Sequence, residues 1–323
     1  MKKLIFLFLA VVICLSAGCS KAGKSKTTIA VIPKGTTHEF WKSIHAGALK
    51  AARENGVEII WKGPQKEDDR TQQIIVVEDF IARKVNGIVL APLDDQALVK
   101  PVEESIAAGI PVVIIDSGIK TGKIVSFVAT DNYKGGVIAA KELGKLLAGK
   151  GEIILVRYQE GSASTMERER GFTETIKAGF PGIKIVGEQY GGATTETSYK
   201  AAENLLNAHP KISGIFCCNE STTFGALRAL QDSGKAGKIK FVGFDSSPKL
   251  VEALAKGQIN GLVLQNPMKM GELGVKTMLD FLNKQQVQSR VDTGVTIATP
   301  ENMHQPEIQK LLNPPFQAIL GVE

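Results

Sequence analysis

Short apolar runs alternate with longer segments of helical periodicity from Thr28 onward. The apolar runs are continuous and rich in β-branched residues, which is typical of strands buried on both faces of a sheet. We expect strands at 29–32, 57–61, 87–90, 110–115 and 124–129, with helices at 39–55, 69–83 and 96–108 between them. Gly56 and Gly109 stand where the first and third of these helices would end.

A second series of the same kind fills the rest of the chain. We expect its strands at 152–156, 183–186, 212–217, 239–244 and 261–264, each followed by a helical stretch. This alternation predicts parallel sheets covered by helices on both faces. A chain of 323 residues exceeds what one hydrophobic core usually serves. The pattern therefore predicts an α/β fold of two doubly wound lobes, similar in architecture but without a close sequence repeat.

The first nineteen residues follow a different pattern. Lys2 and Lys3 precede an apolar run at 4–15, which is too short for an ordinary membrane span, and the run ends at Ala17-Gly18-Cys19. This is the pattern of a secretory signal, predicted at 1–18. The small pair before Cys19 resembles the bacterial lipobox, which implies cleavage before Cys19 and a lipid on its sulfur. The other interpretation is an ordinary signal peptide with an incidental cysteine.

Composition and charge are those of an ordinary soluble globular protein. The chain is 43% apolar and 22% charged, with a formal net charge of +6 to which Lys2 and Lys3 contribute. The polar stretch at 19–27 contains three further lysines and is expected to be a flexible tether. Lysines beside a lipid anchor favour anionic headgroups. No basic face with interleaved aromatic residues is present, so we expect no nucleic acid partner.

The cysteines do not form a disulfide framework. Cys14 lies in the predicted signal and Cys19 at the predicted lipid site, which leaves Cys217 and Cys218. Adjacent residues of a strand point to opposite faces, so we expect two small buried side chains, with a strained vicinal disulfide as the alternative. Two thiolates are half of a zinc site, and we expect neither a metal nor a cofactor.

Polar side chains repeatedly follow the apolar strands. In open α/β sheets, ligands bind beyond the carboxyl ends of the strands. The residues in these places are Lys34, Asp116 with Ser117, Asn219, Asp245 and Gln265. They predict a polar cleft to which both lobes contribute.

An aromatic pair lies next to the first of these strand ends, in His38-Glu39-Phe40-Trp41. Phe40 and Trp41 could belong to the core or form a hydrophobic staple at a helix start. They could equally form an apolar wall against the C–H face of a sugar ring. Carboxylates and amides around hydroxyl groups, with aromatic faces across the ring, suit a polyhydroxylated ligand, because each buried hydroxyl must find a partner.

Four segments together resemble a known family. They are Thr130-Asp131-Asn132 with Gly135-Gly136, Arg168-Glu169-Arg170-Gly171-Phe172, Asn219 with 225–230, and Val242-Gly243-Phe244-Asp245. The chain resembles, over 28–284, the ribose- and galactose-type periplasmic binding proteins of ABC transporters, whose fold is shared with the sensor domains of LacI-like repressors. The resemblance implies ligand contacts from Phe40, Trp41, Asp116, Arg168, Asn219, Asp245 and Gln265. Arg168 could instead be a surface residue, because it lies with Arg170 in a charged helical segment.

The resemblance also implies how the chain is organised. The first lobe would comprise 28–130 and 266–293, and the second lobe 131–265 and 294–323. Three crossings, near 129–130, 265–266 and 293, would form a hinge that closes around the ligand. The family implies a monomer that delivers its ligand to an ABC transporter permease at the outer side of a membrane.

Departures from the family pattern bear on the ligand. Ser117 stands where ribose-type proteins have arginine, and Ala193 where a second-lobe aromatic is often found. Lys34 and His38 stand where small or amide side chains are usual, and the segments around Lys34 and Asp116 look more like the autoinducer-2-binding branch. A lysine near the ligand would favour an oxygen-rich or anionic group, but Asp116 could neutralise Lys34 by pairing. We expect a neutral pentose or hexose as ligand, with autoinducer-2 as the alternative.

Other classes of function find less support. His38-Glu39-x-x-Lys42 lacks the second histidine of a zinc protease motif, and the P-loop-like segment at 144–150 is followed by Gly151 instead of Ser or Thr. We therefore do not expect an enzyme. A repressor would need an N-terminal helix-turn-helix where this chain has a signal and a tether. A sensor that docks on a chemoreceptor or histidine kinase stays open.

We expect the mature chain to begin at a lipidated Cys19. The reason is the apolar run that ends in Ala17-Gly18-Cys19. Mass spectrometry of the membrane fraction should find a diacylglyceryl-modified Cys19. A free protein cleaved after a later residue would contradict the anchor.

Overall fold

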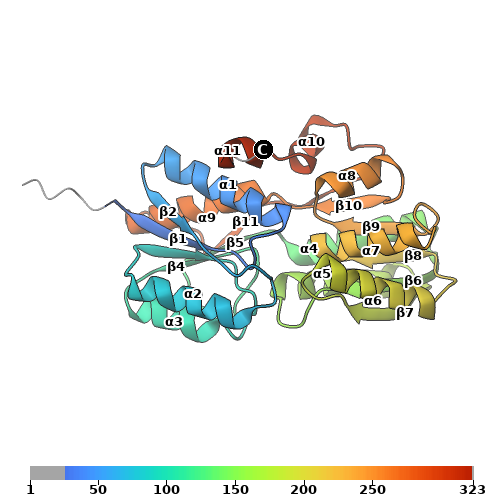
Figure 1. The fold of residues 1–323 in the computed structure, drawn as a ribbon, viewed down its shortest axis with the longest axis horizontal. Coiled ribbons are helices and arrows are strands. Elements are labelled where there is room, and N and C mark those ends of the chain that lie inside the picture. The colour runs from blue at the N-terminus through green and yellow to red at the C-terminus, as the bar shows by residue number, and fades with distance from the viewer. Residues whose placement is uncertain (1–25, 322–323) are drawn as a thin grey trace, which may run out of the picture.

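The computed structural model describes residues 26–321. The predicted signal at 1–18 and the lipid site Cys19 lie outside the described residues. Figure 1 shows two α/β lobes side by side, the first formed mainly by the blue and cyan part of the chain and the second by its green and yellow part. Within 26–321, no helix combines the length and apolar character that crossing a bilayer would need.

The first lobe contains a six-stranded parallel sheet in the order β11-β5-β4-β3-β1-β2. Its strands are β1 (Thr28–Ile32), β2 (Glu58–Trp61), β3 (Gly87–Leu90), β4 (Val112–Ile115), β5 (Ser126–Ala129) and β11 (Arg290–Asp292). Its helices are α1 (Glu39–Glu54), α2 (Arg70–Ala82), α3 (Val99–Ala107) and α9 (Pro267–Leu282).

The second lobe repeats this architecture in the order β12-β10-β9-β8-β6-β7. Its strands are β6 (Lys150–Arg157), β7 (Gly182–Tyr190), β8 (Gly214–Cys217), β9 (Lys240–Phe244), β10 (Gly261–Leu264) and β12 (Thr296–Ala298). Its helices are α4 (Asn132–Leu146), α5 (Ala163–Gly179), α6 (Thr195–Ala208), α7 (Glu220–Asp232), α8 (Pro248–Ala255) and α10 (Pro306–Leu312). The pairing of β10 with β12 is antiparallel, and the other pairings of this sheet are parallel.

Each sheet is buried on both faces, which explains the continuous apolar runs. In β1, Ile29 and Val31 belong to the core cluster that includes residues of α1 and α9. Ala30 and Ile32, which point to the opposite face, belong to the cluster that includes residues of α2. The second lobe likewise has a core on each face of its sheet. The expected α/β fold with two doubly wound lobes is confirmed.

The structure differs from the sequence expectations at short or polar elements. Strand β7 runs to Tyr190, beyond the apolar run at 183–186. Eight of its nine residues are partly buried or exposed, so its second half has no apolar run that could predict it. Strands β11 and β12 have three residues each and present no apolar run, so the pattern could not predict them. Cys217 and Cys218 are buried free thiols, and burial raises the pKa of both.

The chain crosses between the lobes at the three expected places and at one more. It passes from β5 to α4, from β10 to α9 and from β11 to β12. A fourth crossing leads from α10, whose Ile308 and Leu312 belong to the second-lobe core, to α11 (Phe316–Leu320), which lies against α1 of the first lobe. We call residues 313–315 the strap. The sequence places all of 294–323 in the second lobe; this is wrong for α11, which contacts α1 and whose Ile319 oxygen accepts a bond from Arg53.

Two glycines set the position of α5, which carries Arg168. A Cβ on Gly136 of α4 would lie 2.0 Å from the Arg168 carbonyl oxygen, and one on Gly171 of α5 would lie 2.2 Å from the Tyr133 oxygen. The two helices can therefore approach this closely only with glycine at both positions.

Candidate functional site

The carboxyl ends of the two sheets face a common space between the lobes. Asp116 follows β4, the third strand of its sheet counted from β11. Asp245 follows β9, the third strand of its sheet counted from β12. Both aspartates have left-handed backbones, with φ of 61° and 68°. A non-glycine residue adopts this conformation at a cost, and such residues gather at binding sites.

A cavity of about 30 Å³ lies between these strand ends. Nine of the ten predicted ligand contacts line it: Lys34, His38, Phe40, Trp41, Asp116, Arg168, Asn219, Asp245 and Gln265. Ser117 does not line it; its hydroxyl is buried and accepts a 3.0 Å bond from the backbone N–H of Ser164 in the second lobe. Five residues that the sequence did not suggest complete the lining: Glu67, Tyr158, Ser164, Thr165 and Glu220.

The ammonium group of Lys34 contacts side chains of both lobes. Its ammonium lies 3.1 Å from the Asp116 carboxylate and donates bonds of 3.1 Å to the hydroxyls of Ser162 and Ser164. Because an ammonium has three N–H donors, all of them have partners in the protein. Of the two possibilities that the sequence left open for Lys34, the structure shows the pairing with Asp116.

Arg168 is a buried residue of the cleft and not a surface residue. Its side chain donates to the Asn132 side chain at 2.8 Å and to the Cys218 carbonyl oxygen at 3.0 Å, and it lies 4.0 Å from the Asp245 carboxylate. Arg170, by contrast, is exposed and pairs with Glu167.

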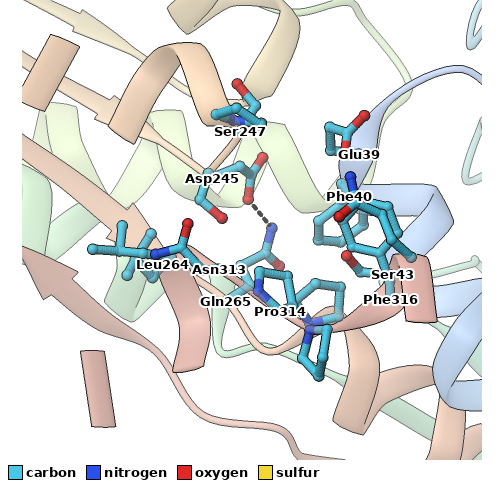
Figure 2. A pocket seen from close by; sticks show the side chains of 16 residues that line it. Glu39, Phe40, Ser43, Asp245, Ser247, Leu264, Gln265, Asn313, Pro314 and Phe316 are labelled. Carbon is cyan, nitrogen blue, oxygen red and sulfur yellow. Dashed lines mark hydrogen bonds between the residues drawn. The ribbon is translucent and has the colours of Figure 1, made fainter. Parts of the chain in front are cut away.

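Asp245 accepts bonds from a side chain and from a backbone group of its own lobe. The Gln265 amide donates to it at 2.7 Å, as Figure 2 shows, and the Glu220 backbone N–H donates at 3.0 Å. Burial raises the pKa of Asp245, while the charge of Arg168 acts in the opposite direction. The Gln265 Oε1 atom is buried and has no hydrogen-bond partner among the described residues. This amide oxygen is therefore an acceptor that a ligand hydroxyl could satisfy.

Glu67 links three side chains that line the cavity. One carboxylate oxygen lies 2.5 Å from His38 Nδ1 and accepts a 2.6 Å bond from Trp41 Nε1. The other accepts a 2.8 Å bond from the Tyr158 hydroxyl of the second lobe. Burial alone would lower the pKa of His38, but the charges of Glu67, Glu220 and Asp245 raise it to about 9. His38 is thus an imidazolium at neutral pH, and both of its ring nitrogens are donors.

Glu220 of the second lobe binds the start of α1 in the first lobe. Its carboxylate accepts bonds from the backbone N–H groups of Phe40 at 3.1 Å and Glu39 at 3.4 Å. An acidic side chain at a helix N-terminus satisfies free donors and complements the helix dipole. Burial raises the pKa of Glu220 to about 7. The bond from its backbone N–H to Glu220 holds Phe40 beside the cavity. There its ring packs edge-on against Trp41, with the ring centroids 5.0 Å apart.

Asn219 lines the cavity and also caps the N-terminus of α7. Its side chain is the N-cap of α7, accepting from the Thr222 backbone N–H at 3.2 Å and donating to Ser221 at 3.1 Å. Such a cap stabilises the helix start by about 1 kcal/mol. The amide is therefore held in one orientation.

The missed residues have different signals in the sequence. Tyr158 follows β6 directly and would have been found by applying the strand-end rule to that strand. Glu220 is next to Asn219 in the chain. Glu67 lies in a loop with two further acidic residues, Asp68 and Asp69, so nothing in the pattern singles it out.

The charges of the site nearly cancel. Lys34 lies against Asp116, His38 against Glu67, and Arg168 near Asp245, which leaves Glu220 as the fourth carboxylate. Hydroxyl groups can exchange bonds with each of these groups without adding charge to a buried space. In the described part of the chain, no group of three or more His, Cys, Asp or Glu is placed to hold a metal ion.

Comparison with known proteins identifies relatives along most of the chain. Residues 29–286 match the family described as periplasmic binding protein domain. The chain is 28% identical over 310 residues to the ribose import binding protein RbsB of Bacillus subtilis, an alignment that covers 93% of this chain and 99% of the relative.

Solved structures of similar proteins agree in fold. A carbohydrate transporter solute-binding protein of Agrobacterium radiobacter in complex with D-arabinose superposes with a TM-score of 0.87 at 36% identity, covering 90% of this chain and 100% of that one. An ABC transporter solute-binding protein of Agrobacterium vitis with bound D-fucose gives a TM-score of 0.86 at 37% identity, covering 88% and 99%.

We expect Glu67→Gln to lower the pKa of His38 from about 9 toward its ordinary value of 6.5, because the carboxylate that opposes the effect of burial is lost. NMR titration of the imidazole measures this directly. The raised pKa stabilises the folded wild type fully below pH 6.5 and not above about 9. The difference in free energy of unfolding between wild type and variant should therefore become smaller as the pH rises from 6.5 to about 9.

Glu39→Gln is the matched control, because Glu39 lies beside His38 in the chain but its side chain pairs with Lys42. An unchanged His38 titration in Glu67→Gln would show that Glu67 does not control the charge of His38.

Proposed function

The chain belongs to the ribose- and galactose-type periplasmic binding proteins, and we propose that it captures a neutral monosaccharide between its lobes and delivers it to an ABC transporter permease. The observation that carries this proposal is the buried, nearly charge-balanced set of hydrogen-bonding groups at the strand ends of both lobes. The relatives crystallised with D-arabinose and D-fucose support the sugar class.

The partners of Lys34 favour a neutral ligand. An unpaired lysine would favour an anionic group, but each N–H of Lys34 already has an acceptor or counter-ion in the protein. An anionic ligand would also add a fifth negative group to the four carboxylates of the site. A neutral sugar avoids that cost and can bind the Gln265 oxygen through a hydroxyl.

The ligand contacts we propose are the nine predicted residues that line the cavity, with Glu220 added. Phe40 supplies an apolar face, while Asp116, Asp245 and Gln265 accept from hydroxyls. The imidazolium of His38 donates to a ligand oxygen through Nε2. We propose that Ser117 acts through Ser164, as a contact between the lobes and not with the sugar.

We further propose a monomeric lipoprotein tethered at Cys19 outside the cytoplasmic membrane. The support is the signal pattern and the polar segment at 19–27. We propose that the protein binds its sugar without transforming it.

A thermal-shift screen against pentoses, hexoses, polyols, sugar acids and autoinducer-2 tests the ligand class. A ligand at 100 times its Kd stabilises the folded state by about 2.7 kcal/mol, so the shift in Tm is readily visible. We expect stabilisation by at least one neutral monosaccharide. Stabilisation by autoinducer-2 or a sugar acid alone would refute the neutral-sugar assignment.

We expect Asp245→Ala to weaken binding of that sugar by about ten- to a hundredfold, because charge-assisted hydrogen bonds are worth roughly 1.5–3 kcal/mol. Alanine also fits poorly at a φ of 68°, so Asp245→Asn, which tolerates this backbone better, separates ligand binding from strain. Calorimetry of both variants, with the surface variant Asp79→Ala as control, gives the measurement. Unchanged affinity in both Asp245 variants would remove this residue from the site.

A further inference from the structure

A second and larger cavity lies between the lobes on the side of the hinge. Its volume is about 210 Å³. The cavity between the strand ends, which we call the cleft cavity, has a volume of about 30 Å³. Figure 2 shows that the wall of the larger cavity combines α1 of the first lobe, the ends of β9 and β10, and the strap with Phe316. The fourth crossing of the chain therefore forms one wall of this space.

The two cavities share part of their lining. Phe40, Asp245 and Gln265 line both of them. The shared polar wall is the hydrogen-bonded pair of Gln265 and Asp245 that Figure 2 marks with a dashed line. Gln265 is 4% exposed, and its Oε1 atom has no partner among the described residues. A ligand hydroxyl that reaches this oxygen can therefore donate to it while the amide N–H keeps its bond to Asp245.

The lining of this second cavity, which we call the hinge cavity, contains both apolar and polar groups. Its apolar groups are Phe40, Pro248, Leu264, Pro267, Leu312, Pro314, Pro315 and Phe316. Its polar groups are Glu39, Ser43, Asp245, Ser246, Ser247, Gln265, Asn313 and Gln317. Flat apolar faces next to hydroxyl, amide and carboxylate groups suit a sugar ring, which has a C–H face and a hydroxylated edge.

We propose that the hinge cavity is a second sugar subsite, so that the protein accepts a disaccharide whose second ring lies behind the Asp245–Gln265 pair. This inference rests on the proposed function, because the first ring occupies the cleft. A larger apolar contact area and further hydrogen bonds make the disaccharide the tighter ligand.

Calorimetry with monosaccharides and with maltose, cellobiose, lactose, melibiose, sucrose and trehalose tests the subsite. We expect at least one disaccharide to bind about tenfold more tightly than either of its constituent sugars, which corresponds to about 1.4 kcal/mol. Binding of monosaccharides without such a gain for any disaccharide would overturn the subsite and leave the proposed function standing. Binding of neither class would overturn both.

Ser43 provides the matched variants, because it lines the hinge cavity and not the cleft cavity. Ser43→Phe fills the space and should abolish the disaccharide gain while leaving monosaccharide affinity within about twofold, whereas Ser43→Ala leaves the space open and should keep the gain. Ser247→Leu, at a half-buried position on another wall, serves the same purpose if Ser43→Phe does not fold. Equal disaccharide affinity in filled and open variants would show that the second ring lies elsewhere.

Discussion

The site depends on hydrogen bonds that its charged side chains make across the interface between the lobes. Seven acidic and basic side chains line a space of about 30 Å³, and a charge buried there without a partner would cost several kcal/mol. Lys34 satisfies its donors on Asp116 and on two second-lobe serines. Glu67 accepts from first-lobe and second-lobe groups, and Glu220 reaches back to the start of α1. The lobes must therefore close in one relative position for these groups to be satisfied together.

The fold brings these groups to the same place through its repeated architecture. Parallel strands end at one edge of each sheet, and the matching strand orders put Asp116 and Asp245 at equivalent positions in the two lobes. Helix packing refines this arrangement, because Gly136 and Gly171 allow α5 to lie directly on α4. This packing places the Arg168 guanidinium 4.0 Å from the Asp245 carboxylate. Chain topology thus supplies the approximate position of each group, and close backbone contacts supply its final one.

The sequence predicted the parts of the structure that follow from regular patterns. Continuous apolar runs identified the buried strands, and the residues after them included Lys34, Asp116 and Asp245. Glu67 could not be found in this way, because its importance comes from three partners that are far from it in the chain and one of which belongs to the other lobe. The strap and α11 were missed because a short amphipathic segment has no periodicity that says which lobe it will pack against.

Direct bonds between the lobes change what a ligand must contribute. A ligand shifts the balance between open and closed forms only by its difference in affinity for the two. Here Lys34, Tyr158 and Glu220 already supply cross-lobe bonds, so less of the ligand's binding energy is needed for closure. Those bonds do not discriminate between sugars, because they involve no ligand atom. Selectivity must then come from groups that the protein leaves unsatisfied, and the buried Gln265 oxygen at the wall between the two cavities is such a group.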